Sequence, residues 1–233
     1  MAKTALVTGC LGAMGKAISL QLAAEGYSVI GTDRADDRRE HVGPYIRCEL
    51  SDIASIEAML EKCSDYARDI SVVVNNAGLY EPKDFFDVTL ADFDRVMTVN
   101  VTAIFMIGQR IARWMIDADT EGSIINIASV NGRLGSLVIP YGTSKSAVIG
   151  LTKSMARALA TRKIRVNAIA PGVIETPMSA AVASDHMKQH FSNVAMERKG
   201  QPSEIAKVVS FLASNASSYM TGSIVDVNGG WPV

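Results

Sequence analysis

Tyr141 and Lys145, in the run Tyr141-Gly-Thr-Ser-Lys145, are side chains whose types and spacing suit proton transfer. In a helix they would share one face, so the ammonium of Lys145 can approach the phenol of Tyr141. A nearby cation favours the phenolate and lowers the phenol pKa from about 10 towards the neutral range, where acid/base catalysis is most effective. Ser129 follows the apolar run Ile124-Ile-Asn-Ile-Ala128 and could point its hydroxyl into the same crevice. We therefore expect a proton to move to or from an oxygen held between Ser129 and Tyr141.

A Tyr and a Lys at this spacing also occur on ordinary exposed helices, so further features are needed to indicate a site. One is the stretch at the start of the chain, where the β-type run 4–8 is followed by Gly9-Cys-Leu-Gly12-Ala-Met-Gly15 and an amphipathic helical pattern. A glycine turn between a strand and a helix lets backbone N–H groups approach a pyrophosphate. The opening stretch therefore predicts a dinucleotide-binding turn, although glycines also mark ordinary turns.

The second expected strand, 28–32, ends on Asp33. In dinucleotide-binding folds an acidic residue roughly 20 residues after the glycine turn binds the adenosine ribose. A carboxylate here favours NAD, because it would repel the extra phosphate of NADP. Arg34, Arg38 and Arg39 could offset that repulsion, or could form a solvated surface with neighbouring acids. NAD is the predicted cofactor and NADP the alternative.

The pattern of short apolar runs alternating with helical stretches predicts an α/β fold of the Rossmann type. We expect a doubly wound parallel sheet of about seven strands with helices on both faces. The expected strands are 4–8, 28–32, 45–48, 71–75, 122–128, 164–170 and 224–228. The expected helices after the first are 53–63, 90–116, 140–160 and 202–213. A hydrophobic fraction of 48% fits a single domain over 1–233, with a substrate flap around 176–200.

Composition excludes several classes of partner. The net charge is −1 and no basic stripe is present, so we expect neither nucleic acid nor a membrane as partner. The three cysteines lack metal-type spacing and, with no apolar run of transmembrane length, predict a cytoplasmic protein with reduced thiols. His186 and His190 have the spacing of helical metal ligands, but Met187 stands where a zinc protease has Glu. We therefore predict no metal.

Four features coincide in the chain: the glycine turn, Asn75-Asn-Ala-Gly78, Ser129 with Tyr141 and Lys145, and Pro171-Gly172. In this order and spacing they resemble the short-chain dehydrogenase/reductase family, in its compact single-domain branch, over nearly the whole chain. The resemblance implies a fourth catalytic residue, Asn100, which in the family holds a kinked helix and a water of a proton relay. It also implies that Lys145 binds the nicotinamide ribose and that Thr176 holds the carboxamide.

The chain departs from the family pattern at two positions. The middle glycine of the family turn falls on Ala13, which bears on the pyrophosphate contacts, and Glu49 stands where relatives commonly have Asp beside the adenine. The family further suggests a homotetramer, with helices 90–116 and 140–160 packing across one two-fold axis. The predicted cofactor residues are Gly9, Gly12, Met14, Gly15, Asp33, Glu49, Leu50, Asn76, Ala77, Gly78, Tyr141, Lys145, Pro171, Gly172, Val173 and Thr176. The predicted substrate residues are Ser129, Asn131, Ile139, Tyr141 and Met178.

The predicted reaction is the reversible oxidation of a secondary alcohol to a ketone with NAD(H) on a small molecule. Tyr141 as phenolate would accept the hydroxyl proton while Ser129 binds the same oxygen. The family leaves sugars or polyols, hydroxy acids and 3-oxoacyl thioesters open, and Arg133 would favour an anionic substrate only if it points inward. The alternatives are a catalytically silent dinucleotide-binding regulator and an epimerase or lyase that uses bound NAD.

Overall fold

Seven parallel strands form one sheet in the order β3-β2-β1-β4-β5-β6-β7. The computed structural model describes residues 3–36, 41–180, 191 and 193–231. The strands are β1 Thr4–Thr8, β2 Ser28–Asp33, β3 Tyr45–Arg47, β4 Ile70–Asn75, β5 Gly122–Ile127, β6 Ile164–Pro171 and β7 Ile224–Val227. The predicted fold class is therefore confirmed.

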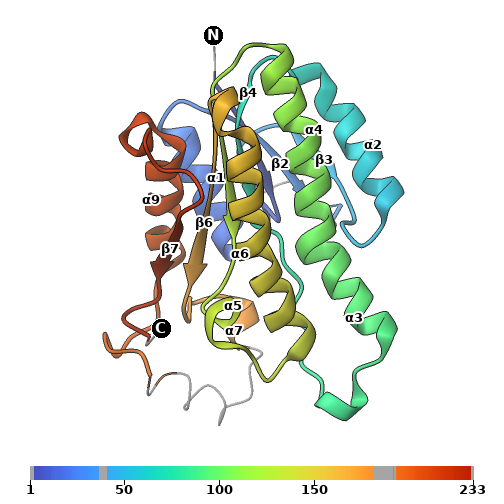
Figure 1. The fold of residues 1–233 in the computed structure, drawn as a ribbon, viewed down its shortest axis with the longest axis vertical. Coiled ribbons are helices and arrows are strands. Elements are labelled where there is room, and N and C mark those ends of the chain that lie inside the picture. Colours follow the sequence, from blue (N-terminus) through green and yellow to red (C-terminus); the bar gives the residue numbers. More distant parts are fainter. Residues whose placement is uncertain (1–2, 37–40, 181–190, 192, 232–233) are drawn as a thin grey trace.

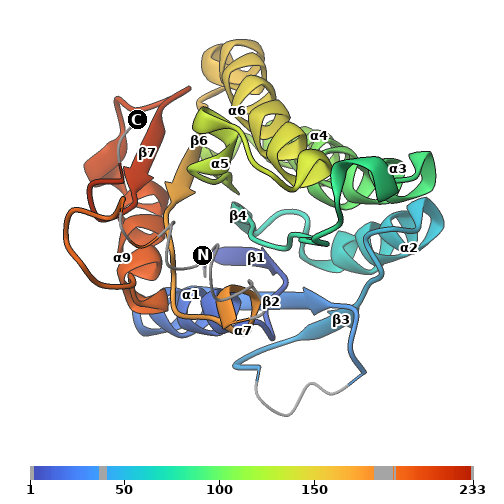
Figure 2. The same ribbon diagram turned by 90° about the horizontal axis from the view of Figure 1, so that it is seen from below.

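Helices cover both faces of the sheet (Figures 1 and 2). One face carries α1 (Ala13–Ala24) and α9 (Pro202–Ala213). The other carries α2 (Ile53–Cys63), α3 (Leu90–Met97), α4 (Ala103–Asp117) and α6 (Ile139–Leu159). The shorter segments are η1 Ser64–Tyr66, η2 Phe85–Asp87, the π-helical turn η3 Thr98–Thr102, α5 Asn131–Leu134, η4 Ala160–Arg162, α7 Pro177–Ala180 and η5 Asn215–Ser217.

Alternate residues of the buried strands serve two separate cores. In β1, Leu6 packs in the core beneath α2 and α4, whereas Val7 packs in the core beneath α1 and α9. In β4, Val73 and Val74 divide in the same way. Each such side chain is fully buried and contributes about 1.5–3 kcal/mol of transfer free energy to the fold. A strand buried on both faces reads as a continuous apolar run, which is why these strands were visible in the sequence.

The order of the strands also locates the functional crevice. The chain moves outward from β1 to β2 and β3, and then returns to pair β4 with the other side of β1. Connections from β1 and β4 therefore leave in opposite directions and open a crevice at their carboxyl ends. The glycine turn after β1 and the Asn75–Gly78 segment after β4 meet there.

The expected helix 90–116 is interrupted in the structure. Its apolar face is buried as predicted, from Val96 and Val99 to Ile111 and Met115, but the π-helical turn η3 separates α3 from α4. Asn100 lies in this turn, and a side chain that bonds outside the helix stabilises such a local irregularity.

The predicted flap around 176–200 is described only in part. It begins with α7, and Ile174 pairs with Gly200 in an isolated parallel bridge. His186, Met187 and His190 lie outside the described residues, and so does the side chain of Met178. In the described part of the chain no three His, Cys, Asp or Glu side chains gather as metal ligands.

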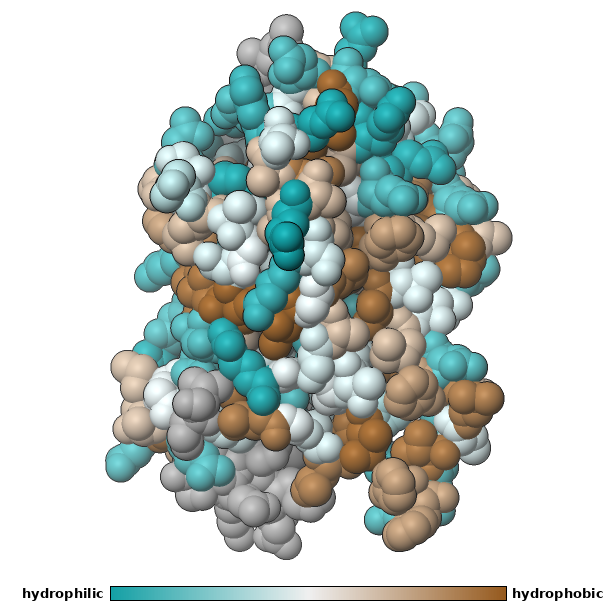
Figure 3. Space-filling view, in the orientation of Figure 1, coloured by the Kyte–Doolittle hydropathy of each residue, from teal (hydrophilic) through white to brown (hydrophobic). Residues whose placement is uncertain are grey.

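The surface is unevenly apolar (Figure 3). Hydrophilic residues dominate the upper end of this view, whereas hydrophobic residues gather at the lower right, over η2 and the start of α3. Phe85, Phe86 and Leu90 in this region are 62%, 90% and 74% exposed. Among the described residues, no helix combines the length and apolarity needed to cross a membrane.

Candidate active site

The glycine turn is shaped by close backbone packing. Gly9 has φ +64°, and a Cβ there would lie 2.9 Å from Cα of Ala77. A Cβ on Gly15 would lie 2.0 Å from O of Gly9, so neither position accepts a side chain. Gly12 is the N-cap of α1, which has no side-chain cap and no acid in its first turn. The first amides of α1 therefore keep the open, positively polarised end that binds phosphate, and Ala13 occupies its first position.

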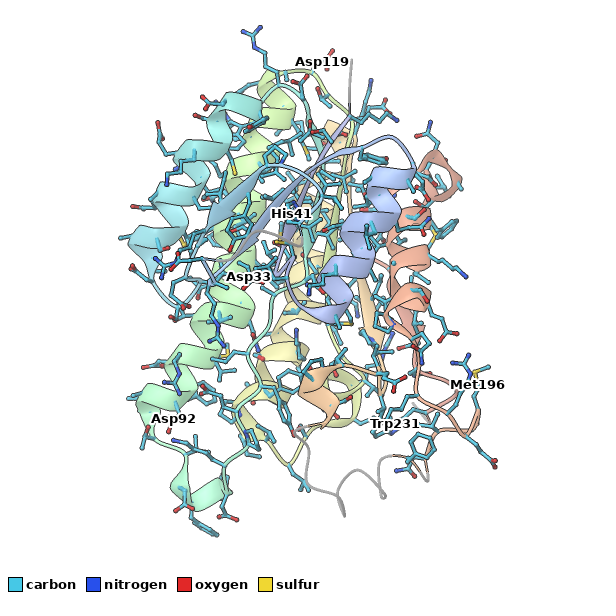
Figure 4. The ribbon with its side chains drawn as sticks, turned by 180° about the vertical axis from the view of Figure 1, so that it is seen from behind. Asp33, His41, Asp92, Asp119, Met196 and Trp231 are labelled. Atoms are coloured by element: carbon cyan, nitrogen blue, oxygen red, sulfur yellow. The ribbon has the colours of Figure 1, made fainter. Side chains whose placement is uncertain are left out.

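Asp33 ends β2 on one side of the carboxyl edge of the sheet, and Trp231 lies on the opposite side, below α9 (Figure 4). The carboxylate of Asp33 accepts hydrogen bonds from the backbone N–H of Leu11, at 3.1 Å, and of Arg34, at 2.8 Å. The carboxylate is thus fixed against the glycine turn. Glu49 follows β3, and its Oε1 accepts from both N and Oγ of Ser51, at 3.1 and 2.8 Å.

The segment after β4 is tied directly to the glycine turn. The backbone N–H groups of Asn76 and Ala77 both donate to Oγ1 of Thr8, at 3.0 Å each. Nδ2 of Asn76 donates to O of Thr8 at 2.9 Å and to O of Gly9 at 3.1 Å. Gly78 lies beside the lysine, because a Cβ built on it would be 3.4 Å from Nζ of Lys145.

Asn100 is fully buried and joins this segment to helix α6. Its Oδ1 accepts from N of Leu79 at 2.7 Å, and its Nδ2 donates to O of Leu79 at 3.0 Å. Nδ2 also donates to Oγ of Ser144 at 2.9 Å, which in turn donates to the carbonyl of Tyr141 at 2.7 Å. One amide therefore fixes the chain after β4 and the turn of α6 that carries Tyr141.

Ser129, Tyr141 and Lys145 meet in one cavity of about 140 Å³. The hydroxyl of Ser129 is near enough to Tyr141 to lower the pKa of its phenol, and Oγ of Ser129 accepts a hydrogen bond from the backbone N–H of Asn131 at 3.1 Å. Nζ of Lys145 lies 5.7 Å from the centroid of the Tyr141 ring and donates to O of Ile127 at 2.7 Å. The predicted residues Met14, Asn76, Gly78, Pro171, Gly172, Val173 and Thr176 also line this cavity.

The electrostatics of this group differ from the expectation. Burial raises the pKa of Tyr141, the hydrogen bond with Ser129 lowers it, and the neighbouring Tyr80 raises it. Burial lowers the pKa of Lys145 from 10.5 to about 8. The expected depression of the phenol pKa is absent from the protein's own interactions, because burial dominates and the ammonium binds a carbonyl instead. The phenol of Tyr141 is therefore protonated at neutral pH.

The opposite wall of the cavity follows β6. A Cβ on Gly172 would lie 2.8 Å from Cα of Asn228, so glycine allows β6 and the segment after β7 to approach closely. Oγ1 of Thr176 accepts from N of Ser179 at 3.2 Å, which holds Thr176 at the start of α7. Trp231 also lines the cavity and packs with Val130.

Not all of the predicted substrate residues line the cavity. Asn131 lines the cavity, but Ile139 is not among its lining residues. Ile139 begins α6 two positions before Tyr141, and a step of two residues turns about 200° around a helix. Arg133 donates to Oδ1 of Asp226 at 2.8 Å and to O of Ile224 at 3.0 Å, so it does not point inward.

Sequence reasoning missed two aromatic residues of the cavity, Tyr80 and Trp231. Each had a signal. Tyr80 follows Asn75-Asn-Ala-Gly78 by two residues, and Trp231 follows two glycines after the last strand. Both segments follow the carboxyl end of a strand at the edge where ligands bind in this type of sheet.

Comparison with known proteins identifies the family to which the chain belongs. The family model described as enoyl-(acyl carrier protein) reductase matches residues 9–232. The chain is 37% identical over 240 residues to a 3-oxoacyl-[acyl-carrier-protein] reductase of Aquifex aeolicus, covering 98% of this chain and 96% of that protein.

Three solved structures share the fold over 98% of this chain. A short-chain type dehydrogenase/reductase from Mycobacterium marinum is 34% identical, with a TM-score of 0.91 and 95% of its chain covered. A protein from Agrobacterium tumefaciens assigned as a 2-deoxy-d-gluconate 3-dehydrogenase, with bound NADP, is 32% identical, with a TM-score of 0.90 and 96% covered. A 4-hydroxyisoleucine dehydrogenase complexed with NADH is 26% identical, with a TM-score of 0.92 and 98% covered. The chain belongs to the short-chain dehydrogenase/reductase family.

Proposed function

We propose that the protein is an NAD(H)-dependent oxidoreductase that interconverts a secondary alcohol and a ketone on a small molecule. The observation that carries this proposal is the meeting of Ser129, Tyr141 and Lys145 in one cavity beside the uncapped start of α1. The relatives named above are reductases and dehydrogenases of carbonyl or hydroxyl compounds, which supports the same reaction class.

Tyr141 is the proposed acid/base group. In reduction its phenol donates a proton to the ketone oxygen while the hydroxyl of Ser129 binds the same oxygen. The raised pKa of Tyr141 suits this direction, because the donor must be protonated. In oxidation the phenol must first lose its proton. The rate of oxidation therefore increases as the pH rises. NADH, when bound, would supply the hydride.

The residues of the turn fit a dinucleotide. The first amides of α1 would hold the pyrophosphate, and Asp33 the adenosine ribose. Lys145 and Thr176 both line the cavity, where they would hold the nicotinamide ribose and carboxamide. Relatives bind either NADP or NADH. We favour NAD because the Asp33 carboxylate would repel a ribose phosphate.

The substrate we favour is a 3-oxoacyl thioester. Its reacting end is neutral, which agrees with Arg133 being held outward by Asp226. The aromatic rings of Tyr80 and Trp231 add apolar surface to the cavity. The 37% identity to a 3-oxoacyl reductase supports the same class. Sugars or polyols and hydroxy acids are the other two classes to be assayed.

The test is nicotinamide absorbance with acetoacetyl-CoA and either NADH or NADPH, using the wild type and Tyr141→Phe. We expect turnover with NADH, and about a 100- to 10,000-fold lower kcat in the variant, because it lacks the proton donor. The NADH dissociation constant should stay the same. Undiminished turnover in Tyr141→Phe would refute its role. Binding of NADH without turnover of any of the three substrate classes would favour the silent regulator, and product formed without net absorbance change would favour an epimerase or lyase.

Two properties of the whole protein follow the same proposal. Cys10, Cys48 and Cys63 are free and buried, which suits the reducing cytoplasm in which we place the protein.

We also propose a homotetramer through the faces of α4 and α6, supported by the exposed Phe105 of α4 and by the apolar residues of η2 and α3. Light scattering should give about 100 kDa for four chains of 24.9 kDa, and a monomeric mass would refute the assembly.

A further inference from the structure

Tyr80 lies beside Tyr141 in the cavity and has no role in the reaction proposed above. Its ring lines the same cavity as Tyr141 and Ser129. The rings of the two tyrosines meet edge to face, with centroids 5.0 Å apart and planes at 87°. This is an attractive arrangement for aromatic pairs, because the positive edge of one ring faces the negative face of the other. Tyr80 therefore contacts the side chain on whose orientation the reaction depends.

The backbone on both sides of this contact is fixed by Asn100. Leu79, directly before Tyr80, has both its N–H and its C=O bound to the Asn100 amide, at 2.7 and 3.0 Å. The same amide reaches the carbonyl of Tyr141 through Ser144. Since both segments are held by one buried group, the rings meet at a set distance.

Two titratable groups face Tyr141 in the described structure. Lys145 approaches from the same helix, with its Nζ 5.7 Å from the ring centroid, and Tyr80 approaches from the segment after β4. Burial raises the pKa of Tyr80. The pKa of Tyr141 is raised first by burial and further by Tyr80, while Ser129 lowers it.

We propose that Tyr80 is a positioning residue for Tyr141: its ring fixes the plane of the Tyr141 ring and directs the phenol oxygen towards Ser129. The kinetic consequence rests on the proposed function, because proton donation requires the phenol within hydrogen-bond reach of the reacting oxygen. Without an edge-to-face partner the Tyr141 ring would populate other orientations, and fewer encounters would be productive.

The kinetic test compares Tyr80→Leu with Tyr80→Phe, using acetoacetyl-CoA and NADH. We expect Tyr80→Leu to lower kcat roughly two- to tenfold, the change that an aromatic pair of about 0.5–1.5 kcal/mol produces, with KM and the NADH dissociation constant unchanged. Tyr80→Phe keeps the ring and should stay within about twofold of the wild type. Tyr66→Leu, which changes a half-buried tyrosine of η1, is the matched control. A wild-type kcat in Tyr80→Leu, or an effect confined to KM, would overturn the proposal.

A second measurement needs no substrate. Carbon-13 labelling at the tyrosine ring carbon bearing the hydroxyl follows each phenol by NMR, and Tyr141→Phe identifies the signal of Tyr141. We expect this signal to shift in Tyr80→Leu, because the neighbouring ring is lost, and to stay near its wild-type position in Tyr80→Phe, which keeps the ring. An unchanged signal in Tyr80→Leu would overturn the contact, and Tyr80→Met serves in its place if Tyr80→Leu does not fold. A wild type that turns over no ketone would refute the proposed function while leaving this NMR comparison to test Tyr80.

Discussion

Lys145→Met is expected to make the protein more stable at neutral pH while it abolishes turnover. The lysine is only 3% exposed, and burial lowers its pKa from 10.5 to about 8. A fall from 10.5 to about 8 means that keeping the lysine charged costs the folded state about 3 kcal/mol at pH 7. Methionine fills similar space without a charge, so this cost disappears in the variant.

The sign and the pH window follow from the two pKa values. Because the folded value is the lower one, the unfolded chain binds more protons between about pH 8 and pH 10.5, and the stability of the wild type rises across that interval. The Lys145→Met variant has no titrating group at this position, so its stability lacks this rise. It also loses the 2.7 Å hydrogen bond to Ile127, at a cost of about 1–3 kcal/mol that does not depend on pH. The stability difference between variant and wild type should therefore fall by about 3 kcal/mol from pH 7 to pH 10.5, whatever the hydrogen bond contributes.

The assay is urea denaturation followed by circular dichroism, at several pH values and one protein concentration. Lys153→Met, on an exposed position of the same helix, is the matched control, and its stability difference should stay nearly constant with pH. A constant difference for Lys145→Met as well would refute the reasoning that the ammonium is strained by burial.

Two further predictions concern the residues that hold the site. Asn100→Leu leaves the N–H of Leu79 without its partner, so urea denaturation should show a free energy of unfolding about 2–4 kcal/mol lower, and kcat should fall. Asn100→Asp still accepts from that N–H, and its free energy of unfolding should lie between those of Asn100→Leu and the wild type. Asp33→Asn keeps an oxygen for the N–H of Leu11 but removes the charge, so NAD should bind roughly 10- to 100-fold more weakly and the preference should move towards NADP. Fluorescence titration with both cofactors checks this, and an unchanged ratio of affinities would contradict the role given to Asp33.

The strands and the glycine turn were predictable because their signals are local. Buried parallel strands appear as short apolar runs, and the turn after β1 contains glycines where a side chain would collide with Ala77 or with the turn itself. The interruption at η3 was not predictable from periodicity. The apolar positions continue across it, and only the partners of Asn100, which are 21 and 44 residues away in sequence, explain it.

The pKa of Tyr141 shows a second limit of the sequence. A spacing of four residues places a cation near a phenol, but it does not reveal that both groups are buried and that the ammonium binds a carbonyl. Tyr80 and Trp231 escaped notice because an aromatic residue in a loop carries no periodic signal. Their role depends on which loops the sheet brings together.

The segment 76–79 is hydrogen-bonded to Thr8 and the glycine turn at one end and to Asn100 at the other. Thr8 and Gly9 bind Asn76 and Ala77, and Asn100 binds Leu79. A ligand that tightens the turn therefore also tightens the framework around Tyr141, so the two binding events share a free energy of coupling. Reciprocity requires that bound ketone and bound cofactor change each other's affinity by the same factor. A substitution at Thr8, which is absent from the lining of the cavity, should alter that factor.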